Sequence, residues 1–322
     1  MIIKSKFKPA WWLASPHAQT IYPSLFRKTR LPALQRKRLE LPDGDFVDLD
    51  WTPDTSGPLV LILHGLEGNI QSHYAAGVLS TLYKASMTIV FMHFRGCSGE
   101  PNRLTRSYHS GETSDLKFVV RTLRNDYPTR EISIIGFSLG GNVLLKWLGE
   151  QAVNANIQRA VAISVPFELS TAADVLEQGA SRLYQRYLLN RLLRSVQTKM
   201  KIMDLPIDAQ DLRKLTTLRA FDNTVTAPLN GFSSAEDYYS QCSSRQFLTH
   251  IRTPTLIIHA EDDPFMNTSV IPKNSELSES VTLEISKHGG HVGFISSHKL
   301  PDPIYWLDLR IRQFLLDAEE RV

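Results

Sequence analysis

The sequence has little cysteine and lacks any long run of apolar residues. Only two of its 322 residues are cysteines, Cys97 and Cys242. Their surroundings suggest neither a disulfide framework nor a metal knuckle, so a reducing compartment fits the chain. No run approaches the ~20 apolar residues that span a bilayer. We therefore expect a cytoplasmic protein without a transmembrane segment.

The N-terminal segment also lacks a secretory signal. An apolar stretch starts at Trp11 and ends after Ala14, where Ser15–His17 interrupts it. A signal peptide needs roughly 7–15 apolar residues. Peripheral membrane contact through Trp11 and Trp12 is the alternative that this stretch leaves open.

Charge of one sign is absent as well. The chain has 36 basic and 33 acidic residues and a net charge of +3. A nucleic-acid binder needs a concentrated basic surface, so we expect no nucleic-acid partner. We interpret the local basic clusters as solvated faces, with attraction to anionic lipid head groups or anionic substrates as the weaker alternative. These clusters are Arg27–Lys28–Arg30, Arg36–Lys37–Arg38 and Arg182–Arg186–Arg191–Arg194.

Short apolar runs that alternate with helix-like stretches predict the α/β class. After an expected hairpin, Arg36–Leu41 with Phe46–Trp51, the runs are hydrophobic on both faces, which is typical of parallel strands covered by helices. The alternation predicts a mostly parallel, doubly wound sheet. The expected strands are Leu59–Leu63, Thr88–Phe94, Glu131–Phe137, Arg159–Val165, Thr255–Ala260 and Val281–Ser286. The expected helices are Gln71–Tyr83, Gly111–Asn125, Leu139–Glu150, Thr268–Ser278 and Tyr305–Ala318.

One segment interrupts the alternation. Residues 166–250 have no good strand pattern but contain the helix-like stretches Ala173–Met203 and Asp208–Arg219. We predict that this segment is an inserted, mostly helical cap, and that residues 1–165 and 251–322 form the core. Residues 1–34 are expected to be an irregular extension, because prolines punctuate them throughout.

The residues Gly136–Gly140 match the pattern G-x-S-x-G. They follow a β run and open a helix, which is the context of a nucleophile elbow. Small residues must flank a serine in such a tight turn, and Gly136 and Gly140 meet that need. Ser138 is therefore the candidate nucleophile, against the alternative that it only caps the helix.

A second glycine-rich loop, His64–Gly68, follows the first core strand. In α/β-hydrolases this loop supplies one oxyanion-hole N–H, and the residue after the nucleophile supplies the other. The candidates are the backbone amides of Leu66 and Leu139. His64 is expected to brace the loop by hydrogen bonding, because its place in the chain order does not suit a base.

The acid and the base should follow the nucleophile in the order Asp or Glu, then His. Three acids, Glu261, Asp262 and Asp263, come after the strand Thr255–Ala260. Asp263 is the candidate because the residue before a proline favours an extended conformation, and Asp262 is the alternative.

The candidate base is His291, which lies in a glycine-containing loop after the last strand, and His288 is the competitor. In these roles His291 takes the proton of Ser138, and the carboxylate fixes the imidazole tautomer. The hard-ligand types between His259 and Asp263 match no metal motif, so neither a metal nor a cofactor is expected.

Longer strings carry a family resemblance over nearly the whole chain. On these strings the chain resembles the AB hydrolase superfamily, family 4, and within it the bacterial YheT-like esterases. The matching strings are Pro9–Leu13 with Pro16–Thr20, His64–Gly68, Arg95–Gly99 with Tyr108–Gly111, Gly136–Asn142, and in the cap Phe221–Asp222, Thr226–Pro228 and Gly231–Phe232.

The resemblance implies a Ser–Asp–His charge relay whose acid is Asp263, and a carboxylic ester substrate. Arg95 and Tyr108–Gly111 have no evident chemical role in the relay, and we interpret them as loop scaffolding, with substrate contact as the alternative. The expected reaction is ester hydrolysis through an acyl-enzyme on Ser138, with a small-molecule ester that carries an apolar acyl group. A thioesterase or acyltransferase, an amidase, and a non-catalytic binding protein of the same fold are the alternatives.

Overall fold

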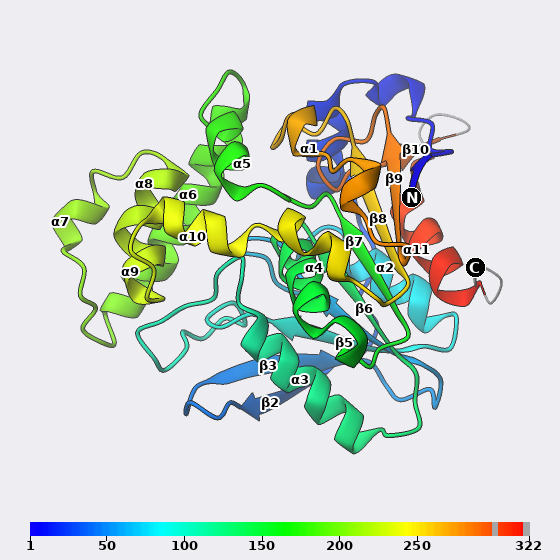
Figure 1. Ribbon diagram of the computed structural model, residues 1–322, viewed down its shortest axis with the longest axis horizontal. Coiled ribbons are helices and arrows are strands. Elements are labelled where there is room, and N and C mark those ends of the chain that lie inside the picture. Colours follow the sequence, from blue (N-terminus) through cyan, green and yellow to red (C-terminus); the bar gives the residue numbers. More distant parts are fainter. Residues whose placement is uncertain (298–301, 318–322) are drawn as a thin grey trace.

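The computed structural model describes residues 1–297 and 302–317. Among them, nine strands form one sheet in the order β1-β9-β8-β7-β6-β4-β5-β3-β2. Neighbouring strands are parallel from β1 to β5, whereas β5, β3 and β2 pair antiparallel at the other edge. The predicted α/β class with a mostly parallel sheet is confirmed (Figure 1). The strands are β1 Ile2–Lys4, β2 Gln35–Glu40, β3 Phe46–Trp51, β4 Leu59–Leu63, β5 Thr88–His93, β6 Ile132–Phe137, β7 Arg159–Ile163, β8 Thr255–Ala260 and β9 Val281–Ser286.

Both faces of the sheet are covered, so the central strands are buried along their whole length. In β4, Leu59, Leu61 and Leu63 face one hydrophobic cluster, whereas Val60 and Ile62 face another. The first cluster includes residues of α3 and α4, and the second includes residues of α2 and α11. Burial on both faces is the reason for the continuous apolar runs in the sequence. These helices are α2 Ala75–Tyr83, α3 Thr113–Asp126, α4 Leu139–Gln151 and α11 Trp306–Leu316.

The segment between β7 and β8, all of which the structure describes, contains helices and no strand. The long predicted helix Ala173–Met203 is two helices, because the chain turns between them at Gly179, whose φ is +47°. In Figure 1 the segment extends to the left of the sheet. We keep the name predicted cap for residues 166–250. Its helices are α5 Leu169–Leu176, α6 Ser181–Met200, α7 Ala209–Leu212, α8 Leu218–Phe221, the π-helix η3 Asp222–Thr226, α9 Ala227–Leu229, α10 Ala235–Cys242 and the 3₁₀ helix η4 Ser244–His250.

The predictions for two other segments are also wrong. Residues 1–34 are not irregular: they contain β1, the 3₁₀ turn η1 Trp11–Leu13 and the helix α1 Pro16–Phe26. Pro16 is compatible with this helix because proline is tolerated in the first turn. The predicted helix Thr268–Ser278 is instead two short 3₁₀ turns separated by Pro272, whose missing N–H and ring oppose a continuous helix.

The remaining elements are short. They are the 3₁₀ turns η2 Ala152–Asn154, η5 Thr268–Val270 and η6 Asn274–Glu276, and a two-stranded sheet of β10 Ile295–Ser296 and β11 Ile304–Tyr305. Among the described residues, no helix is long and apolar enough to cross a membrane.

Candidate active site

Ser138 lies at the sharp turn between β6 and α4. Its backbone has φ 51° and ψ −117°, in a region that residues with a side chain rarely adopt. The turn requires glycine on both sides of the serine. A Cβ at Gly136 would lie 2.5 Å from the carbonyl oxygen of Gly140, and a Cβ at Gly140 would lie 2.5 Å from that of His64. The strained turn thus holds the Ser138 hydroxyl at the carboxyl edge of the sheet.

His291 approaches Ser138 from the loop after β9. Its Nε2 lies 3.0 Å from Ser138 Oγ, within the distance that proton transfer requires. The backbone of this loop is anchored on both sides of the imidazole. His291 N–H donates to Thr20 Oγ1 at 2.9 Å, and Val292 N–H donates to Ser164 Oγ at 3.0 Å.

Sequence reasoning missed these anchors. Thr20 belongs to α1, in the segment predicted to be irregular, and Ser164 directly follows β7. Gln19 has a similar role, since its fully buried amide exchanges hydrogen bonds with both backbone groups of Ile295. The one sequence signal for Gln19 and Thr20 is their place in the string Pro16–Thr20.

Asp263 faces the base, and Asp262 does not. Asp263 Oδ2 accepts a hydrogen bond from His291 Nδ1 at 2.8 Å, and its side chain is 1% exposed. Asp262 instead accepts a hydrogen bond from Gly290 N–H at 3.0 Å and lies 3.2 Å from His288 Nδ1. The two neighbouring acids therefore hold different parts of the same loop.

The ring of Phe265 is stacked on the imidazole of His291. The ring centroids are 3.9 Å apart and the planes differ by 3°. Phe265 N–H also donates to Asp263 Oδ1 at 2.9 Å. One residue thus contacts the candidate base with its ring and the candidate acid with its backbone, and no motif in the sequence identified it.

In the loop after β4, the amide of Leu66 is free although its neighbours on both sides are engaged. The N–H groups of Gly65 and Glu67 donate to tyrosine hydroxyls, and that of Gly68 donates to a backbone carbonyl. The N–H groups of Leu66 and Leu139 have no acceptor among residues 1–297 and 302–317. An oxyanion hole needs donors of this kind, already oriented and not engaged by the protein itself.

His64 braces this loop, as the sequence predicted. Its Nδ1 donates to Gly65 O at 2.7 Å, and its Nε2 accepts a hydrogen bond from Phe94 N–H at 3.1 Å. Complete burial lowers the pKa of His64 to about 3, against the raising effect of the Gly65 bond. The imidazole is therefore neutral and both of its nitrogens are engaged.

The two motif residues without a role in the triad also support loops. Tyr108 Oη lies 2.7 Å from Glu67 N and 2.9 Å from Glu67 Oε1. Arg95 is buried and ion-paired with three carboxylates from two segments, those of Asp43 and Asp45 in the turn between β2 and β3 and that of Asp115 in α3. Among the described residues, no group of three or more His, Cys, Asp or Glu side chains is arranged to hold a metal.

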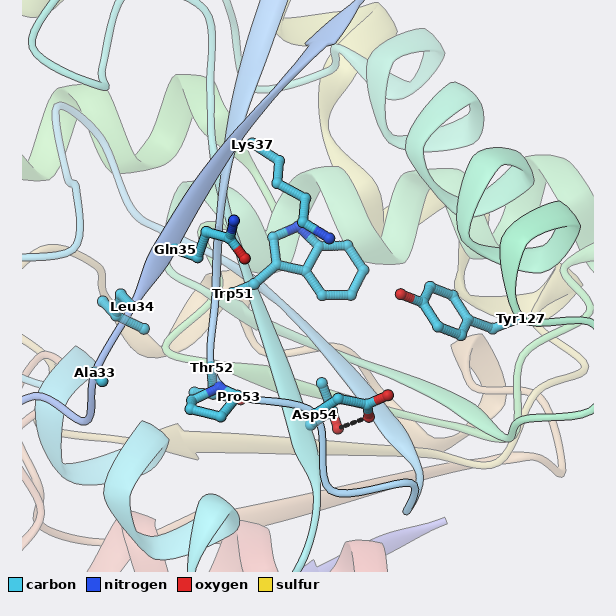
Figure 2. Close-up of a pocket in the computed structure, with 10 residues that line it drawn as sticks. Ala33, Leu34, Gln35, Lys37, Trp51, Thr52, Pro53, Asp54 and Tyr127 are labelled. Carbon is cyan, nitrogen blue, oxygen red and sulfur yellow. Dashed lines mark hydrogen bonds between the residues drawn. The ribbon is translucent and has the colours of Figure 1, made fainter.

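A surface hollow of about 330 Å³ lies elsewhere, at the antiparallel edge of the sheet. Figure 2 shows Lys37, Trp51 and Tyr127 around it. The Lys37 ammonium lies 4.7 Å from the centre of the Trp51 ring, so two residues that line the hollow form a cation–π contact with each other. None of its lining residues belongs to the Ser138 site.

The serine on a strained strand–helix turn, with its partners on loops after later parallel strands, defines a hydrolase of the α/β-hydrolase type. The family model described as the alpha/beta hydrolase fold matches residues 58–297, and the chain belongs to this family.

Several relatives of the chain carry names of esterases and lipases. The chain is 43% identical to the "Putative esterase YheT" of Escherichia coli over 317 residues, which cover 97% of this chain and 93% of the relative. It is 32% identical to a monoacylglycerol lipase of Saccharomyces cerevisiae over 75% of this chain and 56% of the lipase. The solved structure of the Pyrococcus furiosus esterase Pf2001 has a similar fold, with a TM-score of 0.57 at 16% identity over 98% of this chain and 97% of that one.

Proposed function

We propose that the protein is a carboxylic ester hydrolase that acts through an acyl-enzyme on Ser138. The observation that carries the proposal is the continuous hydrogen-bonded row from Ser138 Oγ through His291 to Asp263, next to two free amides. A cytoplasmic location, expected from the cysteine content, belongs to the same proposal.

In the first step, Ser138 Oγ attacks the ester carbonyl carbon while His291 Nε2 takes the hydroxyl proton. The carbonyl oxygen becomes an oxyanion that accepts hydrogen bonds from the Leu66 and Leu139 amides. Losing one such donor typically costs roughly 10²–10³ in rate. Asp263 holds Nδ1–H and stabilises the imidazolium that forms.

The second half of the reaction uses the same groups. The tetrahedral intermediate collapses, the C–O bond to the alcohol breaks, and His291 gives its proton to the leaving oxygen. A water molecule then attacks the acyl carbonyl while His291 takes one of its protons. Collapse releases the carboxylic acid and returns a proton to Ser138.

An apolar acyl group fits the surroundings of Ser138. Leu66 on the oxyanion side and Phe265 on the base side both pack against the hydrophobic cluster of the predicted cap. That cluster includes Leu189, Leu192 and Phe221. We infer that the acyl chain binds between Leu66 and Phe265, against these cap residues.

The test is labelling by a fluorophosphonate probe together with turnover of p-nitrophenyl esters of graded chain length. We expect the wild type and Ser240→Ala, which changes an exposed serine on α10, to label and turn over. Ser138→Ala should do neither. Absence of labelling and turnover in a folded wild type would reject the proposal in favour of a binding protein. Turnover of thioesters or amides in preference to esters would reject the substrate class while keeping the nucleophile.

A further inference from the structure

Two helices expose apolar side chains that the fold does not cover. On α1, Ile21 and Leu25 lie one turn apart and are 43% and 66% exposed. On α6, Leu183 and Tyr187 also lie one turn apart and are 73% and 59% exposed. Exposed apolar residues that occur singly need no explanation, but rows along helices do.

The two rows adjoin. His17 Nδ1 on α1 lies 3.0 Å from Tyr184 Oη on α6, and the two rings are stacked. Ile21 is one helical turn from His17, and Leu183 and Tyr187 flank Tyr184 on α6. Trp11 and Phe26, which are 73% and 59% exposed, lie at the two ends of the α1 region. We call Trp11, Ile21, Leu25, Phe26, Leu183 and Tyr187 the α1–α6 face.

Unpaired positive charge surrounds this face. The sequence has no acidic residue before Glu40, and α6 contains none. Exposed cations without an ion-pair partner among the described residues occur on both sides, at Lys28 and Arg30 after α1 and at Arg182, Arg186 and Arg194 on α6. In contrast, Arg36 and Arg38 of β2 are paired with aspartates.

Exposed apolar side chains together with unpaired cations limit the kinds of partner that could bind the α1–α6 face. A second copy of the chain would bring like charges into contact, and a nucleic acid would leave the leucine and isoleucine rows unburied. The head-group region of an anionic bilayer takes up aromatic and aliphatic side chains while it neutralises neighbouring cations. We propose that the α1–α6 face docks on an anionic lipid surface.

Docking would bring the lipid beside the candidate active site. The Tyr184 ring lies 5.0 Å from the Phe265 ring, and Phe265 is stacked on His291. The row His17, Tyr184, Phe265, His291 therefore leads from the proposed lipid surface to the candidate base. The docking proposal itself does not require that the chain hydrolyse esters.

The test is co-sedimentation of the full chain with vesicles. We expect binding to phosphatidylglycerol vesicles that weakens with salt, and little binding to pure phosphatidylcholine. The double variant Leu25→Ser/Leu183→Ser should bind at least about tenfold more weakly, and Arg182→Gln and Arg186→Gln should each cost roughly fivefold, which corresponds to about 1 kcal/mol per cation. The matched control is Val153→Ser, at an exposed apolar site outside the face.

Several outcomes would overturn this proposal. They are absence of wild-type binding to anionic vesicles, an equal loss in Val153→Ser, or a concentration-dependent dimer that Leu25→Ser/Leu183→Ser abolishes. The last result would assign the face to self-association. Turnover of a water-soluble ester serves as the check that the variants are folded.

A different observation concerns Glu67, in the oxyanion loop. Its φ is +52°, which is unfavourable for a residue with a side chain. The core holds it through Tyr108, which contacts both its N–H and its carboxylate. The predicted cap holds it through α6, because Arg191 donates to its carbonyl oxygen and Ser195 Oγ donates to Oε2 at 2.5 Å.

These contacts determine which amide of the loop is free. Tyr74 occupies the Gly65 N–H and Tyr108 occupies the Glu67 N–H, so of the three successive amides from Gly65 to Glu67 the Leu66 N–H remains for the substrate. We infer that Tyr108 and Arg191 are positioning residues that hold Leu66 N–H in place, and that α6 thereby completes the oxyanion hole. This inference rests on the proposed function.

The test compares steady-state kinetics of Tyr108→Phe and Arg191→Gln with those of Arg213→Gln, an exposed arginine elsewhere in the predicted cap. We expect kcat to fall roughly 10–100-fold in the first two with KM within about twofold, because the lost interaction matters mainly in the transition state. Arg191→Lys should recover part of kcat. An unchanged kcat, or a change in KM alone, would overturn the inference. The variants should still be labelled completely by the fluorophosphonate probe on long incubation. Such labelling shows that Ser138 is the nucleophile even where the inference about Tyr108 and Arg191 fails.

Discussion

The sheet and the predicted cap are built in different ways. Every residue of β4, β5, β6, β7 and β8 is buried, and each strand contributes to the clusters on both faces. The cap consists of the long helix α6, several short helices and a π-helix around a smaller cluster, in which many members are only partly buried. The sheet therefore fixes the positions of the candidate residues Ser138, Asp263 and His291. The cap instead presents an apolar surface whose side chains are less completely buried.

Two buried carboxylates, one in the sheet and one in the cap, have pKa values shifted in opposite directions. In the sheet, Asp50 has a pKa well below its usual range, because hydrogen bonds from Arg36 and His93 outweigh the raising effect of burial. In the cap, burial raises the pKa of Asp222 to about 6, although hydrogen bonds from Thr226 and Tyr239 oppose this rise. Asp50 of the sheet is thus paired with a cation, whereas Asp222 of the cap is buried without a cation in direct contact.

The cap is fastened to the core by polar contacts. Lys199 of α6 is buried and donates to Asn102 Oδ1, Ser107 Oγ and two backbone carbonyls of the loop after β5. Burial lowers its pKa to about 8. This lysine and the contacts to Glu67 connect one cap helix to two loops of the core.

The largest effect should come from the two adjacent acids of the core. We expect Asp263→Asn to lower kcat by about 10⁴, because an amide cannot hold the His291 tautomer. The matched change Asp262→Asn should cost less than about tenfold, since Asp262 contacts only the loop. Steady-state kinetics on a p-nitrophenyl ester measure both. Equal losses in the two variants would contradict the assignment of Asp263.

Glycine substitutions test the rigidity of the two regions. A Cβ at Gly140 would meet backbone atoms of Leu63 and His64 at 2.5–2.8 Å, so Gly140→Ala should destabilise the protein by several kcal/mol. Gly179 of the cap has a positive φ but nothing within 4 Å of its Cβ position, so Gly179→Ala should cost about 1–2 kcal/mol. Urea unfolding measures both. A larger loss at Gly179 would contradict the contrast between a tightly packed core and a looser cap.

The smaller effect is a pH dependence of the cap. The folded-state pKa of Asp222 is about 6, above the 3.8 usual for an aspartate, so its contribution to stability is present below pH 4 and is lost as pH rises through 6. In the wild type this titration should cost about 2 kcal/mol of stability between pH 4 and 7, and Asp222→Asn should abolish that loss.

The measurement is urea unfolding at both pH values in the wild type and in Asp222→Asn. Asp308, whose pKa burial also raises to about 6, stays in both proteins, so the difference isolates Asp222. If the free energy of unfolding depends on pH in the same way in both proteins, ionisation of Asp222 does not destabilise the fold and the prediction is wrong.

Local patterns predicted the sheet well and the rest less well. Six core strands were predicted within two residues of their ends, because residues buried on both faces leave an unbroken apolar run. The helix predicted after β8 is interrupted at Pro272, and α1 escapes prediction because Pro16 and Pro23, which lie within it, ordinarily indicate irregular structure. Short helices depend on their packing partners more than on their own sequence.

By itself, the sequence determined the class of fold and the glycine-flanked turn at Ser138, and it pointed to Asp263 and His291 as candidates, since each of these depends on residues next to it in the chain. Only the tertiary structure decided that Asp263 and not Asp262 meets His291, that Phe265 stacks on the imidazole, and that Thr20 holds the loop from 271 residues away. The physical reason is that hydrogen bonds and ring contacts act over a few ångströms, and only folding brings such distant segments together.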